Sequence, residues 1–250
     1  MLKKELSPGI IHYMFPPRRV ELGYNIVAVI DGDKAVLIDA AYEVEAQQVL
    51  DDLTVNGITI EKVIISHFHT DHFFGLHVLP DVPFYGGARY KETLIFEGAA
   101  EEDVNKYTPT FIVDKPTTIK FGSHEIELTP FPGHALCSLL VKINNQFLYI
   151  GDDMIFLNDG RQTLPYLCDS RKDIARQLEA LDKLKKYSEL TIIPAKGPAF
   201  EGNKLHKYAQ NLIVYLNAVL EAAGKITYEE AVKNCDYPLL QSHWHEHNCR

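Results

Sequence analysis

The segment Ser66-His67-Phe68-His69-Thr70-Asp71-His72 constrains this chain more than any other part of its sequence. It places three imidazoles and a carboxylate close together, directly after an apolar run of strand length at 63–65. In an extended segment, residues two apart point the same way, so His67 and His69 can present two ring nitrogens to one ion. Borderline ions such as zinc favour nitrogen and carboxylate ligands, and the cysteines typical of structural zinc sites are missing here. The segment therefore predicts a metal-binding site, followed by a helix capped by Thr70 or Asp71.

Strand and helix patterns alternate along the chain. Apolar or alternating runs predict strands at 24–30, 35–39, 63–65, 83–85, 126–128, 139–143, 147–150 and 191–193. Helical spacing of apolar residues predicts helices at 46–53, 91–96, 174–184 and 205–219. No internal repeat, low-complexity tract or linker divides the 250 residues, a length that fits one domain. We expect an α/β layered fold with helices on the outside, and residues 1–250 forming a single domain.

Charge and composition limit the classes of partner that this chain is expected to bind. Acidic residues outnumber basic ones by 34 to 25, which gives a formal charge of −9, and no basic run could neutralise a phosphate backbone. We therefore expect a small-molecule substrate and no nucleic acid; a homodimer stays open. No window approaches the roughly 18 apolar residues of a membrane span, and the N-terminus breaks with Glu, Ser and Pro before any signal-like stretch, so we expect a cytoplasmic protein without a membrane partner.

The four cysteines lie far apart without a C-x-x-C pair and are expected to be reduced thiols.

The histidine segment resembles the metallo-β-lactamase superfamily, whose signature is H-x-H-x-D-H after a strand. His67, His69, Asp71 and His72 match that signature in full. The resemblance implies a four-layer αββα sandwich with a metal centre, and the spacing of the motifs covers about residues 24 to 197.

The resemblance also implies residues elsewhere in the chain. A third histidine for the first metal would be His134, in the Pro-Gly-His setting before a strand, and a bridging aspartate would be Asp152. Asp153, next to it, is the less favoured bridge. Asp39 matches the aspartate that buttresses the metal loop, although the family usually has a glycine soon afterwards and this chain has Ala40-Ala41.

The last family motif differs in this chain. The family typically has a Gly-His pair after a late strand, whereas residues 193–198 read Ile-Pro-Ala-Lys-Gly-Pro, with Lys196 in place of the histidine. An ammonium has three donors and no lone pair, so it cannot bind a cation and would repel one nearby. One interpretation is a mononuclear enzyme. Another, favoured here, is a two-metal site in which Asp71, His72 and Asp152 hold the second ion and Lys196 anchors a substrate carboxylate or stabilises an oxyanion. The third is that Lys196 is a solvated loop residue.

The C-terminal segment His243-Trp244-His245-Glu246-His247-Asn248 has histidines at alternate positions. If it were extended, it could bind metal, and one of its histidines could fold back to replace the missing ligand. The alternative, favoured here, is the last turn of a surface helix.

The expected function is that of a metal-dependent hydrolase. The cofactor would be zinc, one or two ions, with manganese or iron as alternatives, and the activated water would attack a small ester, lactone, thioester or related substrate. Asp71 would orient the nucleophile or act as general base. A di-iron oxidoreductase is an alternative, but such relatives typically have a glutamate where this chain has His69, and a flavin domain. The Lys196 departure also leaves open a ligand-binding or regulatory protein with little turnover.

Overall fold

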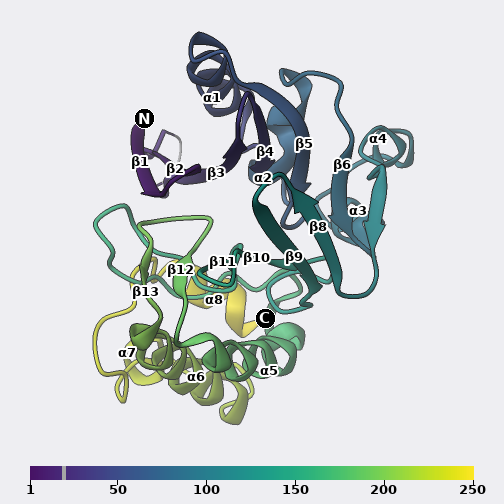
Figure 1. Ribbon diagram of the computed structural model, residues 1–250. Helices are drawn as coiled ribbons and strands as arrows, with labels where there is room; N and C mark the ends of the chain where they lie inside the picture. The colour runs from purple at the N-terminus through teal and green to yellow at the C-terminus, as the bar shows by residue number, and fades with distance from the viewer. Residues whose placement is uncertain (19–20) are drawn as a thin grey trace.

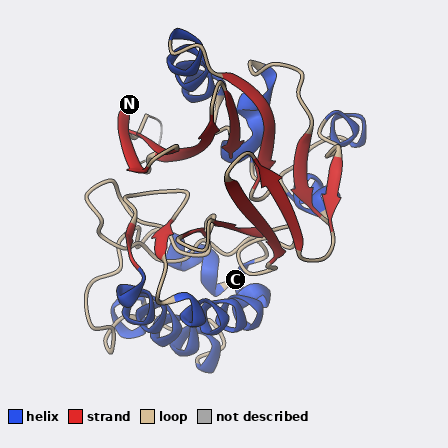
Figure 2. Cartoon of the chain, viewed as in Figure 1, coloured by secondary structure: helices blue, strands red, loops and turns tan. Residues whose placement is uncertain are grey.

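Two mixed β-sheets face each other across a shared apolar core, and helices cover the outer face of each sheet (Figures 1 and 2). The computed structural model describes residues 1–18 and 21–250, without the side chains of residues 101–103. The first sheet has the strand order β1 to β7: Leu2–Ser7, Ile10–Phe15, Tyr24–Asp31, Lys34–Ile38, Thr59–Ile65, Phe84–Gly87 and Phe111–Val113. The second has the order β13-β12-β11-β10-β9-β8, whose strands in chain order are Thr117–Phe121, His124–Pro130, Leu139–Ile143, Phe147–Tyr149, Thr191–Ile193 and Phe200–Glu201.

The helices lie on the outside of this pair of sheets. They are α1 Glu43–Val55, α2 Thr70–Phe73, α3 Tyr90–Phe96, α4 Glu101–Lys106, α5 Ile174–Leu184, α6 Leu205–Glu221, α7 Tyr228–Ala231 and α8 Trp244–Cys249. Short 3-10 helices are η1 Phe74–His77, η2 Ser170–Asp173, η3 Lys185–Tyr187 and η4 Gly202–Lys204. In Figure 1, α5 and α6 run side by side under the second sheet, while α1 and α3 lie against the first. Among the described residues, no helix is both long and apolar enough to cross a membrane.

The strands bury both of their faces, which explains their nearly continuous apolar runs. In β4, Val36 and Ile38 face the core between the sheets, while Ala35 and Leu37 face the core under α1. The same alternation occurs in the second sheet, where β10 turns Val141 inward and Leu140 towards α5 and α6. Three apolar clusters therefore separate four layers, in the order helix, sheet, sheet, helix. This confirms the predicted αββα sandwich.

Five loops that follow strands meet at one edge of the sandwich. Strands β4 and β5 are parallel, as are β11 and β12, and β9 runs in the same direction as β11 because both are antiparallel to β10. The segments that leave these five strands contain Asp39, the histidine segment 66–72, His134, Asp152 and Lys196. The topology therefore brings all the predicted site residues together.

Candidate metal centre

Three histidine rings converge at this edge of the sandwich. His67 Nε2 lies 3.2 Å from His69 Nδ1, and His134 Nε2 lies 3.0 Å from the same atom. All three side chains are buried, and one nitrogen of each lies within 4.8 Å of the others. The structure thus brings together the three residues that the resemblance assigns to the first metal.

The outward nitrogen of His67 is held by a serine. Ser66 Oγ donates to Asp39 Oδ2 at 2.8 Å and lies 3.1 Å from His67 Nδ1. Because the hydroxyl proton is already used, Ser66 Oγ accepts a hydrogen bond from His67 Nδ1. The lone pair of His67 is therefore on Nε2, which faces the centre.

The other two rings are fixed in the same way. His134 Nδ1 donates to the Tyr166 carbonyl oxygen at 3.0 Å, which leaves the lone pair on Nε2. The thiol of Cys168 donates to the His134 carbonyl oxygen at 3.0 Å, so its sulfur accepts from His69 Nε2 at 3.2 Å. Burial lowers the pKa of His134 to about 4 and the pKa of His67 and His69 well below the ordinary histidine value. Three neutral imidazoles thus direct lone pairs at one point, a donor set that fits a divalent ion.

The two neighbouring aspartates have different roles. Asp152 Oδ2 lies 3.3 Å from His72 Nε2 and 4.0 Å from His134 Nε2, and within the described chain its buried Oδ1 has no hydrogen-bond partner. Asp153 instead accepts the His134 backbone N–H at 2.9 Å, and burial raises its pKa to about 7. This close approach requires Gly133, since a Cβ there would lie 2.1 Å from Asp153 Oδ1. Asp152 is therefore the aspartate that faces the centre.

Lys196 occupies the position beside the histidine triad where a second ion would bind. Its Nζ lies 2.5 Å from Asp152 Oδ2, 2.8 Å from Asp71 Oδ2 and 3.0 Å from His72 Nε2. The side chain is buried, so the interpretation of Lys196 as a solvated loop residue is wrong. Asp71, Asp152 and His72 surround the ammonium at 3.0 Å or less, so it does not face a substrate carboxylate or an oxyanion. The favoured two-metal interpretation, with Lys196 as a substrate anchor, does not match this geometry.

The loop that carries Lys196 is fastened to β3. Asn25 Nδ2 donates to the carbonyl oxygens of Pro194 and Gly197, at 2.8 and 2.6 Å, and Asn25 N–H donates to the Ala195 carbonyl at 2.9 Å. Burial lowers the pKa of Lys196, but Asp152 and Asp71 outweigh burial and raise it above the usual lysine range. Lys196 is therefore a fixed positive charge.

Asp39 forms hydrogen bonds both with Ser66, which contacts His67, and with His72, which contacts Lys196. Its Oδ1 accepts from the Ser66 N–H at 2.7 Å, and its Oδ2 accepts from Ser66 Oγ, from Tyr149 Oη at 2.7 Å and from His72 Nδ1 at 2.8 Å. The other ring nitrogen of His72, Nε2, faces Lys196 and Asp152. Ala41, where the family usually has glycine nearby, adopts a φ of 49° in the left-handed region that favours glycine.

The charges around His72 leave a net negative charge beside the histidine triad. Asp39, Asp71 and Asp152 carry three negative charges, and Lys196 balances one of them. Burial and Lys196 lower the pKa of His72, but the three carboxylates outweigh them and raise it to about 10. With His72 protonated as well, three carboxylates face two positive charges, and the negative charge that remains favours a cation on the histidine triad.

Several expectations about neighbouring residues need correction. Helix α2 has His69 as its N-cap and no side-chain cap, so neither Thr70 nor Asp71 caps it; Asp71 pairs with Lys196 instead. His245 and His247 lie in helix α8 and His243 is its N-cap, and among the described residues none of the three belongs to a group that could hold a metal ion. His247 packs flat on Tyr166, with ring centroids 5.0 Å apart, and its Nε2 donates to the Leu167 carbonyl at 2.5 Å. The helix thus supports the loop that holds His134 and His69.

The sequence reasoning missed four residues that position the centre, namely Ser66, Tyr149, Cys168 and Asn25. Ser66 could have been suspected because it directly precedes His67. The other three contact the site across more than 95 residues of sequence, and no local pattern marks them.

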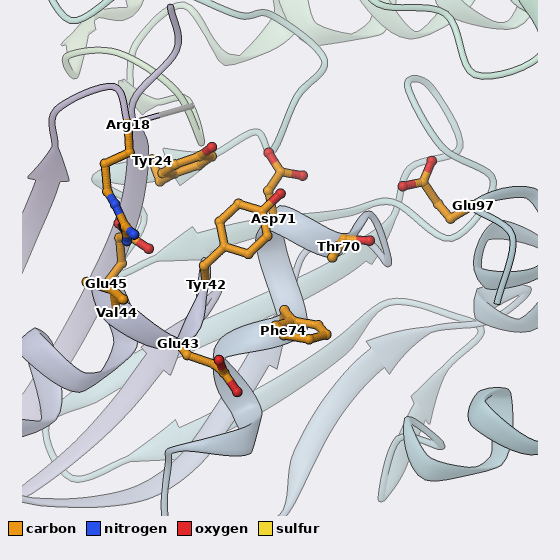
Figure 3. A pocket seen from close by; sticks show the side chains of 10 residues that line it. All are labelled: Arg18, Tyr24, Tyr42, Glu43, Val44, Glu45, Thr70, Asp71, Phe74 and Glu97. Atoms are coloured by element: carbon orange, nitrogen blue, oxygen red, sulfur yellow. Dashed lines mark hydrogen bonds and ion pairs between the residues drawn. The ribbon is translucent and has the colours of Figure 1, made fainter. Parts of the chain in front are cut away.

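A cavity of about 450 Å³ lies beside the centre, with Asp71 in its wall (Figure 3). We refer to it as the Asp71 cavity. Its lining residues are Arg18, Tyr24, residues 42–45, Thr70, Asp71, Phe74 and Glu97. The cavity gives a small molecule access to the side of the site that carries Asp71.

Comparison with known proteins places the chain in a family. The model of the metallo-beta-lactamase superfamily matches residues 19–196. A hydroxyacylglutathione hydrolase of Pectobacterium carotovorum is 27% identical over 133 residues, which cover 52% of this chain and 46% of the relative, so the chain spans about half of that protein. A hydroxyacylglutathione hydrolase of Haemophilus ducreyi is 23% identical over 222 residues, covering 87% of this chain and 81% of the relative.

A solved structure agrees at the level of the fold. A beta-lactamase domain protein from Burkholderia ambifaria superposes with a TM-score of 0.71 at 15% identity, covering 99% of this chain and 85% of the other. The family model, the αββα architecture and the histidine cluster lead to one conclusion: the chain belongs to the metallo-β-lactamase superfamily.

Proposed function

We propose that this protein is a hydrolase that works with one divalent metal ion, held by His67, His69 and His134, and that Lys196 permanently replaces a second ion. The observation that carries the proposal is the position of Lys196 Nζ, within 3.0 Å of Asp71, His72 and Asp152 together. A cation in this place supplies the charge that Asp71 and Asp152 need. Because it is part of the chain, it cannot dissociate.

The bound ion would supply Lewis-acid chemistry, by polarising a carbonyl oxygen and lowering the pKa of water. The three histidines hold it through nitrogens whose tautomers Ser66, Cys168 and Tyr166 fix. Zinc is the ion we propose, because neutral imidazoles with a nearby carboxylate suit it.

Asp71 is the group we propose for proton transfer. Its side chain is 21% exposed and lines the cavity, whereas Asp39 and Asp152 are buried. Burial raises its pKa, but Lys196 and His72 outweigh burial and lower it, so Asp71 is a carboxylate at neutral pH. It can therefore accept a proton from the water that attacks the substrate carbonyl and pass it to the alcohol or thiol that departs.

The substrate we propose is a small ester or thioester. The relatives named hydroxyacylglutathione hydrolase are named for an acyl derivative of the thiol glutathione, which supports an acyl bond of this kind. The cavity of about 450 Å³ is of the size that takes a small molecule. Lys196 argues against the di-iron alternative, since its ammonium stands where a second iron would have to bind.

Metal counting tests the proposal. Protein stripped with a chelator and reloaded separately with zinc, manganese or iron(II) is analysed for ions per chain and assayed on ester, lactone and thioester substrates. One ion per chain and hydrolysis by at least one loaded form are expected, and Lys196→His should raise the count towards two. Two tightly held ions in the unaltered protein would refute the role of Lys196. Absence of both bound metal and hydrolysis would refute the function as a whole.

A further inference from the structure

The geometry of the Asp71 cavity points to a substrate that carries a positive charge, and we infer that this cavity binds a cationic group such as an ammonium while the acyl bond lies at the metal centre. This inference rests on the proposed function for the reaction, and adds to it the chemical class of the substrate.

Four carboxylates line the cavity against one basic side chain. The carboxylates are those of Glu43, Glu45, Asp71 and Glu97. Among the described lining residues the basic one is Arg18, which is already paired with Glu45 Oε1 at 2.9 Å. Lys196 pairs with Asp71 from outside the cavity, so Glu43 and Glu97 leave a net negative charge on the described lining residues that attracts cations.

Glu45 contributes an unsatisfied carboxylate oxygen to this wall. Its side chain is 1% exposed, and within the described chain its Oε2 has no hydrogen-bond partner. A buried carboxylate oxygen without a partner is costly, and a donor from a ligand would remove that cost. Arg18, whose side chain is 42% exposed, contacts Oε1 only, and Oε2 remains unpaired within the described chain.

Aromatic rings complete the cavity. The rings of Tyr24 and Tyr42 meet edge to face with centroids 5.3 Å apart, and Phe74 lies 6.4 Å from Tyr42. Figure 3 draws the two tyrosines between Glu45 and Asp71. Ring faces attract ammonium groups, most strongly where water is displaced, so acidic and aromatic walls favour the same kind of ligand.

An anionic substrate fits this wall poorly. A glutathione conjugate carries two carboxylates and one ammonium, and its net negative charge would meet Glu43 and Glu97 beside the paired Glu45 and Asp71 among the described lining residues. The cavity thus separates this chain from the relatives whose names specify a glutathione conjugate.

Matched substrates test the inference. Metal-loaded protein is assayed on acetylthiocholine and on its neutral isostere, in which a quaternary carbon replaces the quaternary nitrogen. We expect kcat/KM for the cationic thioester to exceed that for the isostere by about tenfold or more, the effect of a desolvated cation–aromatic contact. Binding of choline and ethanolamine is measured in parallel by calorimetry, with the neutral isostere of choline as control.

Glu45→Gln is expected to reduce the preference for the cationic thioester at least severalfold. Asp51→Asn is the matched control, because it removes one carboxylate from the exposed side of the same helix, where Asp51 contacts Gln47. If Glu45→Gln does not fold, as judged by circular dichroism, Tyr42→Leu replaces it and should also reduce the preference.

The outcomes separate the two proposals. Equal hydrolysis of both thioesters, without choline or ethanolamine binding, would overturn the cation site and leave the hydrolase intact. A second outcome is that choline or ethanolamine binds, that Glu45→Gln weakens this binding, and that neither thioester is hydrolysed. This result would support the cation site and count against the proposed reaction.

Discussion

Lys196 Nζ lies 2.5 Å from Asp152 Oδ2, and both side chains are only 5% exposed. This pair lies in the interior, where water cannot solvate either charge. Asp71 and His72 complete the surroundings of the ammonium, so a single lysine neutralises a site that would otherwise be strongly negative.

Lys196→Met should therefore destabilise the protein considerably. Removing one partner of a buried ion pair leaves the other charge uncompensated, at a cost of about 3–5 kcal/mol in the free energy of unfolding. Urea denaturation of the metal-loaded protein measures this change in the free energy of unfolding. Lys183→Met is the control, because Lys183 is 57% exposed and pairs with Glu179 on the surface of α5, where little change is expected. Equal losses in the two variants would show that the interior position of Lys196 is unimportant.

His134→Ala should abolish metal binding at the histidine triad. Two imidazoles would remain, and the hydrogen bond from the His134 ring to the Tyr166 carbonyl would be lost as well. Metal per chain after gel filtration is the measurement. The exposed His206→Ala on α6 should keep the metal content of the unaltered protein. Full metal content in His134→Ala would remove His134 from the ligand set.

Most of the sandwich was predictable because its strands are buried on both faces. Runs such as Val63-Ile64-Ile65 and Leu139-Leu140-Val141 are apolar at every position, and the predicted strands and helices between 24 and 219 all occur. Strands β1, β2, β7, β8 and β13 were not predicted. Strand β1 is an edge strand with mostly exposed residues, so Leu2-Lys3-Lys4-Glu5 lacks an apolar run. Such a strand is specified by its partner β2 and not by its own sequence.

At the site, residue types were predictable and side-chain contacts were not. The spacing of His67, His69 and His72 is local, so the sequence alone predicts a metal centre. The position of the Lys196 ammonium depends on Asn25, which lies 169 residues from Pro194 in the chain. Sequence spacing carries no information about such a contact, so the sequence alone could not place the Lys196 ammonium between Asp71 and Asp152.

Asp39→Asn should weaken metal binding without removing any ligand. Asp39 accepts four hydrogen bonds, and an amide nitrogen in place of one oxygen would face a donor and disturb Ser66 or His72. Loss of such an orienting partner typically lowers metal affinity about 10- to 100-fold. Competition with a chelator gives the affinity. Asp31→Asn is the matched control, since Asp31 accepts from the Ser123 backbone and hydroxyl far from the centre. Identical affinities in the two variants would contradict this role of Asp39.

Cys168→Ala and Cys168→Ser should differ in metal affinity. The alanine variant leaves His69 Nε2 without its acceptor and frees the ring to change tautomer, whereas a serine hydroxyl can replace the thiol. We expect the alanine variant to bind zinc about tenfold or more weakly and the serine variant to stay close to the unaltered protein. Chelator competition at constant pH measures both. Equal weakening in both variants would mean that the thiol acts through its packing and not through its hydrogen bonds.

His12→Gln should flatten the dependence of stability on acid pH. Burial in β2 lowers the pKa of His12 from 6.5 to about 4, and Lys4 lowers it further, while Asn25 opposes them. Because the folded-state pKa is below the unfolded one, the unfolded chain binds more protons, and stability falls as pH decreases from about 6.5 to about 4. A shift of this size corresponds to about 3 kcal/mol at the acid end of that window. Thermal unfolding of metal-loaded protein between pH 4 and 8 should show the smaller slope in His12→Gln, while the exposed His206→Gln keeps the original slope. Parallel curves for all three proteins would mean that the pKa of His12 is the same in the folded and unfolded states, contrary to its burial.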